Sequence, residues 1–131
     1  MGWWEVISDK INTRDKLFTP GRGPEKTREK PFTILSKDLE RIFILSGKSP
    51  IPLEKDCFEI VEKAFSDNPT LWLRVASLHD SEAFENSADK LVREGTCSQL
   101  ARGNYICALL EHFGLVGYTM HGNKKGIELI R

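Results

Sequence analysis

The chain has 131 residues and carries 19 basic and 19 acidic residues, so its formal net charge at pH 7 is zero. With 40% hydrophobic and 29% charged residues, the composition is that of a globular protein, which excludes an intrinsically disordered chain. The length suits one ordinary domain or two very small ones that share a core, and the neutral charge argues against a protein that coats nucleic acid non-specifically.

The N-terminal region predicts a short β-strand followed by a loop. The segment WWEVI, residues 3–7, is rich in strand-forming residues and has neither the basic start nor the long apolar core of a signal peptide. The segment TPGRGPEKTREKP, residues 19–31, predicts a loop because of its Pro, Gly and charged residues. No apolar run approaches the roughly 18 residues that suggest a membrane span, so no membrane partner is expected.

Residues 32–54 predict further strands. FTIL and RIFIL are apolar, strand-forming segments, and the residues SKDLE between them have the length of a hairpin connection. Gly47 supplies a turn, and Pro50 and Pro52 limit the next segment to a sheet edge or an extended exit. Three or four short strands are expected to form a small curled sheet or barrel around Trp3, Phe32, Ile34, Ile42 and Ile44.

Helices are expected from about Leu53. Apolar residues recur at helical spacing in PLEKDCFEIVEKAFSD, residues 52–67. DNPTLWLRVASLHD, residues 67–80, begins with Asp67 or Asn68 as a cap and Pro69 in the first turn, which predicts a second helix. SEAFENSADKLVREG, residues 81–95, predicts a third helix that ends at Gly95.

The C-terminal third predicts a helix followed by a β-hairpin. Thr96 or Ser98 can cap the helix SQLARGNYICALLEHFG, residues 98–114, which Gly114 ends. Its apolar stripe consists of Tyr105, Ile106, Leu109, Leu110 and Phe113. Two alternating segments, LVGYTM and GIELI, then flank HGNKK, and Gly122-Asn123 and Gly126 are available for positive φ.

The order of helix, short break, long helix, glycine and hairpin resembles the C-terminal half of winged-helix domains. The resemblance covers about residues 81–131 and rests on TCSQLARGNYICALLEHFGLVGYTMHGNKKGIELI, with its capped polar start, small-residue turn, apolar stripe, LLE, and GLV before the hairpin. It implies an α+β protein with a small N-terminal β-rich lobe, residues 1–53, and a helical lobe, residues 54–131, that ends in the hairpin.

The resemblance places the start of the last helix at a DNA groove, with the hairpin against the backbone. Because the apolar stripe must face the core, four polar residues are expected at the exposed helix start: Ser98, Gln99, Arg102 and Asn104. Arg pairs with guanine, and Gln or Asn with adenine, through two hydrogen bonds. The hairpin adds three candidates for phosphate contacts: His121, Lys124 and Lys125. Arg102→Ala is therefore expected to weaken binding to a preferred site and relax specificity.

Charge is segregated along the chain. Residues 10–30 hold seven basic and three acidic residues, whereas residues 79–94 hold five acidic and two basic residues. The loop of residues 19–31 is therefore a second candidate for contact with phosphates or RNA. Its basic residues are Arg22, Lys26, Arg28 and Lys30. A solvated loop is the alternative, and the acidic stretch argues against DNA if it shares a face with the helix start.

No residue pattern predicts catalysis or a metal site. The three histidines have separations that match no helical metal pair, and the carboxylates of residues 80–89 lack a glycine-bounded ligand loop. The three cysteines lack CxxC spacing and indicate reduced thiols in a cytoplasmic protein. Neither a catalytic residue, a metal nor a cofactor is expected.

The function expected from these patterns is non-enzymatic binding of double-stranded DNA by a small regulator or accessory subunit. Two alternatives remain open. One is an adaptor that binds a protein partner through the same winged-helix fold, and the other is the specificity part of a nuclease complex. DNA binding should weaken steeply with salt, whereas an adaptor should show no such dependence.

Overall fold

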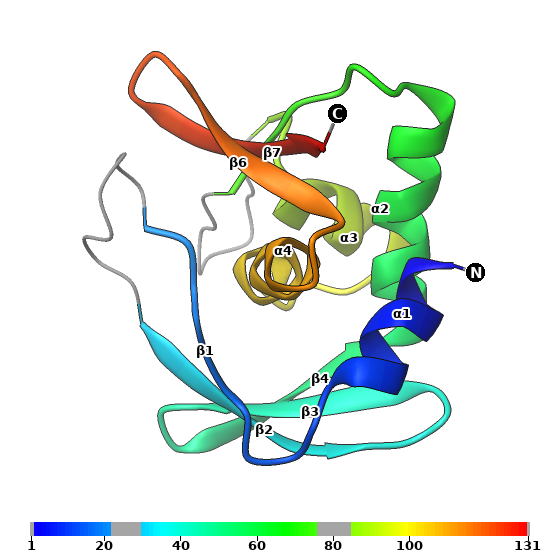
Figure 1. The fold of residues 1–131 in the computed structure, drawn as a ribbon, viewed down its shortest axis with the longest axis vertical. Helices are drawn as coiled ribbons and strands as arrows, with labels where there is room; N and C mark the ends of the chain where they lie inside the picture. The colour runs from blue at the N-terminus through cyan, green and yellow to red at the C-terminus, as the bar shows by residue number, and fades with distance from the viewer. Residues whose placement is uncertain (1, 22–29, 76–84, 131) are drawn as a thin grey trace.

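The structure of the protein is a computed structural model that describes residues 2–21, 30–75 and 85–130. Over these ranges the chain forms four helices and two antiparallel sheets, an α+β arrangement (Figure 1). The first sheet has the order β1-β2-β3-β4, with β1 (Lys16–Phe18), β2 (Pro31–Lys37), β3 (Arg41–Ser46) and β4 (Ser49–Glu54). The second has the order β5-β7-β6, with β5 (Leu73–Arg74), β6 (Val116–His121) and β7 (Lys124–Leu129). The helices are α1 (Trp3–Lys10), α2 (Lys55–Asp67), α3 (Ala88–Thr96) and α4 (Gly103–His112).

The N-terminal segment is a helix, so the strand predicted for residues 3–7 is wrong. α1 buries Trp4 and Ile7, and the Ile11 side chain that follows is also buried. Positions 4, 7 and 11 follow helical spacing, so they lie on one side of the helix. The aromatic composition of WWEVI favours a strand, but burial of this stripe against the rest of the protein favours the helix.

Two sets of contacts hold α1 in place. The ring of Trp4 lies 5.5 Å from that of Phe58 on α2, measured between centroids. At the other end, the Lys37 ammonium donates hydrogen bonds to the carbonyl oxygens of Ser8, at 2.6 Å, and Ile11, at 3.0 Å. A helix leaves its last carbonyl groups without partners, and Lys37 supplies a donor for them from β2.

The strands predicted for residues 32–54 are confirmed. β2 and β3 pair as the predicted hairpin, and β4, which contains Pro50 and Pro52, is an edge of the sheet. Proline is tolerated there because one side of an edge strand needs no ladder hydrogen bond. Gly47 has a φ of +70° in the turn between β3 and β4.

The helix predicted from Asp67 is absent over the part of it that the structure describes. α2 ends at Asp67, and the Asn68 side chain accepts hydrogen bonds from the N–H and hydroxyl of Thr70, at 3.3 and 2.9 Å. Leu73–Arg74 then form β5, which pairs with β7. Leu73 and Val75 are buried, whereas Arg74 between them is half-buried. Residues 76–80 of the predicted helix lie outside the described residues.

The last two helices and the hairpin follow the predicted order, with changed boundaries: α3 begins at Ala88 and ends one residue after Gly95. α3 is confirmed and is capped by the Ser87 side chain, which accepts the N–H of Lys90 at 3.0 Å. α4 begins at Gly103, later than the predicted start at Ser98. The predicted hairpin is confirmed as β6 and β7, and Gly122 has the positive φ, +66°, that a type II′ turn needs at its first central residue.

The hydrophobic core runs through both halves of the chain. Its buried side chains come from α1, the strands of the first sheet, α2, α3, α4 and the hairpin. Figure 1 shows α4 in the centre of the molecule, with the first sheet on one side and the hairpin on the other. Within the described residues, no helix has the length and apolar character needed to cross a bilayer.

Candidate functional site

The start of α4 is buried, so the prediction that Arg102 lies at an exposed helix end is wrong. Arg102 directly precedes α4 and is 1% exposed. Its guanidinium is ion-paired with Glu54, and it donates hydrogen bonds to the Pro52 carbonyl oxygen, at 3.3 Å, and to the Thr96 hydroxyl, at 3.0 Å. The side chain therefore ties the end of β4 to the end of α3.

The first turn of α4 is also covered by α3. The N–H of Gly103 donates a hydrogen bond to the Asp89 carboxylate at 3.2 Å, and Asp89 is buried and ion-paired with Arg93 at 3.0 Å. A Cβ at Gly103 would lie 2.5 Å from the Cα of Asp89, so the two helices meet at their backbones. Asp89 thus occupies the place that a phosphate would take at the N-terminus of this helix.

The first sheet covers the side of α4 that carries Tyr105. The ring of Tyr105 meets that of Phe32 edge to face at 5.2 Å, and its hydroxyl donates to Ser46 at 3.0 Å. Of the other predicted base readers, Ser98 and Asn104 are half-buried and Gln99 is exposed. The four predicted residues therefore do not form one exposed surface.

The three hairpin candidates point to two different faces. Neighbouring residues on a strand alternate between faces, so Lys124 and Lys125 point in opposite directions. His121 and Lys124 are cross-strand partners and exposed, and the His121 ring stacks on Trp72 at 4.2 Å. Lys125 lies on the other face and is 9% exposed.

The secondary basic loop is described at its two ends, residues 19–21 and 30–31. Lys30 is exposed, and its N–H donates a hydrogen bond to the Thr19 hydroxyl at 2.9 Å. Arg22, Lys26 and Arg28 lie outside the described residues.

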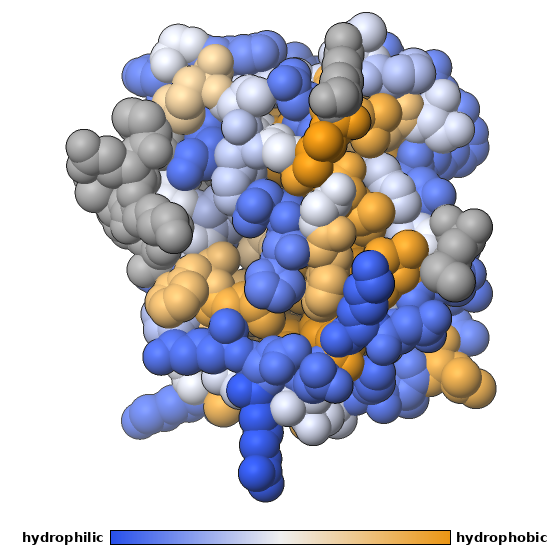
Figure 2. Space-filling view, in the orientation of Figure 1, coloured by the Kyte–Doolittle hydropathy of each residue, from blue (hydrophilic) through white to orange (hydrophobic). Residues whose placement is uncertain are grey.

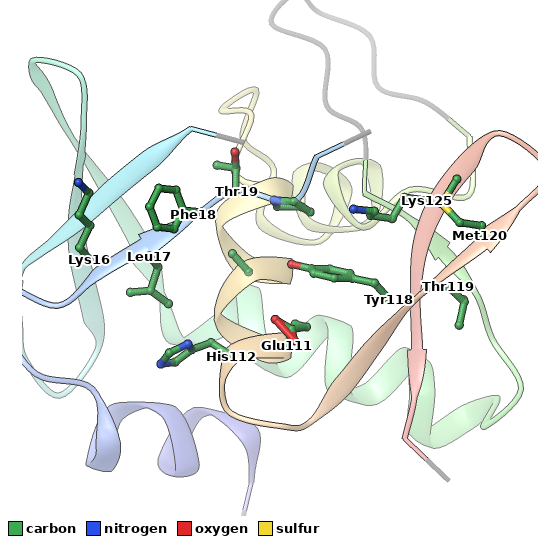
Figure 3. Close-up of a pocket in the computed structure, with 12 residues that line it drawn as sticks. Lys16, Leu17, Phe18, Thr19, Glu111, His112, Tyr118, Thr119, Met120 and Lys125 are labelled. Carbon is green, nitrogen blue, oxygen red and sulfur yellow. The ribbon is translucent and has the colours of Figure 1, made fainter. Parts of the chain in front are cut away.

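Lys125 lines a cleft of about 560 Å³ between the two sheets (Figure 3). One wall is β1 with the two residues after it, the other is the hairpin, and α4 contributes Ala108, Glu111 and His112 between them. β1 and β6 are edge strands of their respective sheets. Tyr118 extends from the hairpin over α4, toward the side of the cleft where β1 lies.

Each wall of the cleft pairs a lysine with an aromatic ring. On β1, the Lys16 ammonium lies 5.7 Å from the centroid of the Phe18 ring, and Phe18 is 50% exposed. On the hairpin, the Lys125 ammonium lies 5.3 Å from the centroid of the Tyr118 ring. Figure 2 shows hydrophobic residues at the surface beside α4, below the ends of the hairpin strands, with hydrophilic residues over α4 itself and over the first sheet below.

The side chain of Lys125 is mostly covered by the residues around the cleft, and its ammonium has no carboxylate partner among the described residues. Within residues 2–21, 30–75 and 85–130, no carboxylate forms an ion pair with it. A partly covered ammonium is less well hydrated than one on an open surface, so a nearby opposite charge stabilises it. The cation–π contact with the Tyr118 ring stabilises the Lys125 ammonium by only about 0.5–2 kcal/mol. An anion that enters the cleft would supply the missing charge.

The buried cysteines are protonated at neutral pH. Burial raises the pKa of Cys57 to about 12, and burial likewise raises the pKa of the Cys107 thiol, next to the buried Asp89 charge. A thiolate is the nucleophilic form, so neither side chain is poised to react. Cys97 is exposed, and none of the three forms a disulfide. Among the described residues, no group of three or more His, Cys, Asp or Glu side chains is placed to hold a metal ion.

Sequence reasoning missed most of the cleft residues. In the segment Lys-Leu-Phe, Lys16 and Phe18 flank the buried Leu17. This alternation is typical of a half-buried strand and could have placed Lys16 and Phe18 on one face of it. Nothing in the sequence places them beside the hairpin, because the two walls are about 100 residues apart in the chain.

No protein-family model matches this chain, and neither a curated protein nor a solved structure is significantly similar to it.

Proposed function

We propose that the protein is a non-enzymatic DNA-binding protein, a small regulator or accessory subunit, that binds DNA through the cleft between β1 and the hairpin. The observation that carries this proposal is Lys125, a lysine that is 9% exposed and lines the cleft without a carboxylate partner among the described residues. Phosphate is an anion that lysine binds well, and Lys16 brings a second cation to the same cleft.

The order of elements over residues 55–129 supports the proposal. The described residues of this range form α2, β5, α3, α4, β6 and β7 in that order, and their sheet has the order β5-β7-β6. This is similar to the arrangement of helices and strands in winged-helix domains, in which the hairpin lies against the DNA backbone. Lys125 belongs to that hairpin, so backbone contact by the hairpin and anion binding in the cleft use the same element.

The proposed mode differs from groove reading by a helix. The first sheet and Asp89 cover the start of α4, so that helix cannot enter a major groove in this arrangement. Contacts from lysines to phosphates position DNA without reading its sequence. We therefore expect low base specificity and a strong dependence on salt.

The proposal predicts that Lys125→Met and Lys16→Ala weaken DNA binding. Each lost phosphate contact should lower the log–log salt slope by about 0.9 on duplex DNA and the affinity by roughly tenfold at low salt. The measurement is fluorescence anisotropy of labelled DNA at a series of salt concentrations. Lys48→Ala, in the exposed turn between β3 and β4, removes the same charge outside the cleft and should change neither quantity.

The choice of methionine separates binding from folding. Methionine keeps the apolar stem of Lys125 and removes its charge, which forms no ion pair with the described residues, so the free energy of unfolding should change little. Destabilisation with unchanged DNA affinity would assign Lys125 a structural role and overturn the proposal. Salt slopes that are equal in Lys125→Met and Lys48→Ala would contradict it as well. Binding of an acidic peptide in place of DNA would favour the protein adaptor.

A further inference from the structure

We infer that the cleft holds an unpaired nucleotide, with its base against the Phe18 ring and a phosphate at Lys125. The inference rests on the proposed function and specifies its ligand: a single-stranded end or segment of DNA. It is carried by the combination of a cleft, an exposed aromatic ring and a mostly covered lysine that has no carboxylate partner among the described residues.

The shape of the site favours a single strand over a duplex. A cleft of about 560 Å³ lies within the range of about 300–1,000 Å³ in which proteins enclose small ligands. α4 forms the floor of the cleft, and the edge strand β1 and the hairpin form its walls, so a ligand must enter between the two walls (Figure 3). A base in a duplex is stacked and paired, and only an unpaired one can be inserted.

The aromatic ring on β1 suits a nucleobase. Phe18 is 50% exposed on an edge strand, with the Lys16 ammonium above its ring. Sites for single-stranded nucleic acid combine a cationic groove with aromatic rings on which bases stack. Phe18 provides the stacking surface, and Lys16 and Lys125 provide cations on either wall for the backbone.

The carboxylate in the cleft argues against an acidic peptide as the ligand. Glu111 is exposed and lines the cleft, so it would repel a carboxylate or a phosphate placed beside it, and the neutral part of a ligand must lie there. A nucleobase instead carries amino groups, from which a carboxylate accepts hydrogen bonds. Among the described residues Glu111 is the single acidic residue of the lining, and it is compatible with a base beside it while the phosphate lies at Lys125.

The test compares three probes on the unmodified protein: a short single-stranded oligodeoxynucleotide that contains 2-aminopurine, a blunt duplex of the same sequence, and an oligoglutamate peptide. We expect the single strand to bind at least about tenfold more tightly than the blunt duplex, with quenching of 2-aminopurine fluorescence by stacking on an aromatic ring. Phe18→Leu should reduce the affinity for the single strand by roughly 5- to 100-fold and relieve the quenching.

Phe43→Leu is the matched control. Phe43 lies on β3 beneath Arg41, whose guanidinium is 5.5 Å from the ring centroid, so it is also an aromatic residue paired with a cation on the first sheet. It does not line the cleft, and its replacement should leave both affinity and quenching unchanged.

The outcomes separate this inference from the proposed function. Equal affinity for single strand and duplex, without quenching and without an effect of Phe18→Leu, would overturn the unpaired nucleotide and leave DNA binding intact. Binding of oligoglutamate, without binding of the single strand or the duplex, would overturn both the unpaired nucleotide and the proposed DNA binding. Tight, quenched binding of the single strand that Phe18→Leu weakens and Phe43→Leu does not would support both.

Discussion

Arg102 shows how burial changes the role of a side chain. In the sequence it follows a polar segment and precedes an apolar helix, a position that favours exposure and base readout. In the structure it is 1% exposed and joins Glu54, Pro52 and Thr96. The guanidinium carries five donors in a planar fork, which lets one side chain connect several acceptors from separate elements.

The structure therefore predicts that Arg102→Ala is a stability variant. Removing one partner of a buried ion pair typically costs about 3–5 kcal/mol, and we expect about 2–3 kcal/mol here because the Glu54 side chain is 40% exposed and can be hydrated again. Urea unfolding measures the loss, and DNA affinity is measured under conditions where the variant remains folded. The affinity should be unchanged.

The exposed Gln99 provides the control for this prediction. Gln99→Ala should leave the free energy of unfolding unchanged to within about 0.5 kcal/mol, as for most surface positions. If Arg102→Ala instead weakened DNA binding without loss of stability, the buried role of Arg102 would be refuted and an exposed helix start would be supported.

At the scale of elements, the contact between α3 and α4 is set by a glycine. Gly103 has no side chain, so the backbone of α4 can approach Asp89, whose carboxylate accepts the Gly103 N–H. An added Cβ would lie within 2.6 Å of the Asp89 backbone N and Cα, atoms that cannot move without shifting α3. The requirement for glycine here is steric and comes from the neighbouring helix.

Gly103→Ala should therefore destabilise the protein, by about 2–3 kcal/mol. The sign is diagnostic because alanine in a helix is normally favoured over glycine by about 1 kcal/mol. Thermal or urea unfolding provides the measurement. Gly117→Ala is a control, since its added Cβ would meet only Ile130 at an ordinary 3.7 Å, and should have little effect. A stabilised Gly103→Ala variant would show that the two helices are not in backbone contact.

At the scale of the whole molecule, the two halves of the chain are joined by packing. Trp4 on α1 packs on Phe58 of α2, and Tyr105 on α4 packs on Phe32 of β2, so aromatic contacts cross between the predicted lobes. Buried residues of both halves belong to the same cluster. Separate unfolding of either half would expose the apolar surface that it shares with the other.

We consequently expect one cooperative unfolding transition. In a Trp72→Phe variant the remaining tryptophans, Trp3 and Trp4, report on α1, whereas far-ultraviolet circular dichroism reports on all helices and strands. The two signals should change with the same urea midpoint, as two-state unfolding requires. Two separate midpoints would indicate that residues 1–53 and 54–131 unfold independently.

The sequence by itself determined the elements whose conformation depends on near neighbours. The hairpin of β2 and β3, the edge position of the Pro-containing β4, α2, α3 and the hairpin of β6 and β7 were all predicted, because turn residues and short-range apolar periodicity fix them locally. The α+β class followed from these elements.

Only the tertiary structure decided which surfaces are covered. The helical state of residues 3–10, the short β5, the burial of Arg102 and the opposite directions of Lys124 and Lys125 all depend on segments distant in the chain. The cleft has the same origin, since Lys16 and Lys125 meet only when two edge strands come together beside α4. Burial depends on which distant segments pack against each other, and local sequence patterns do not carry that information.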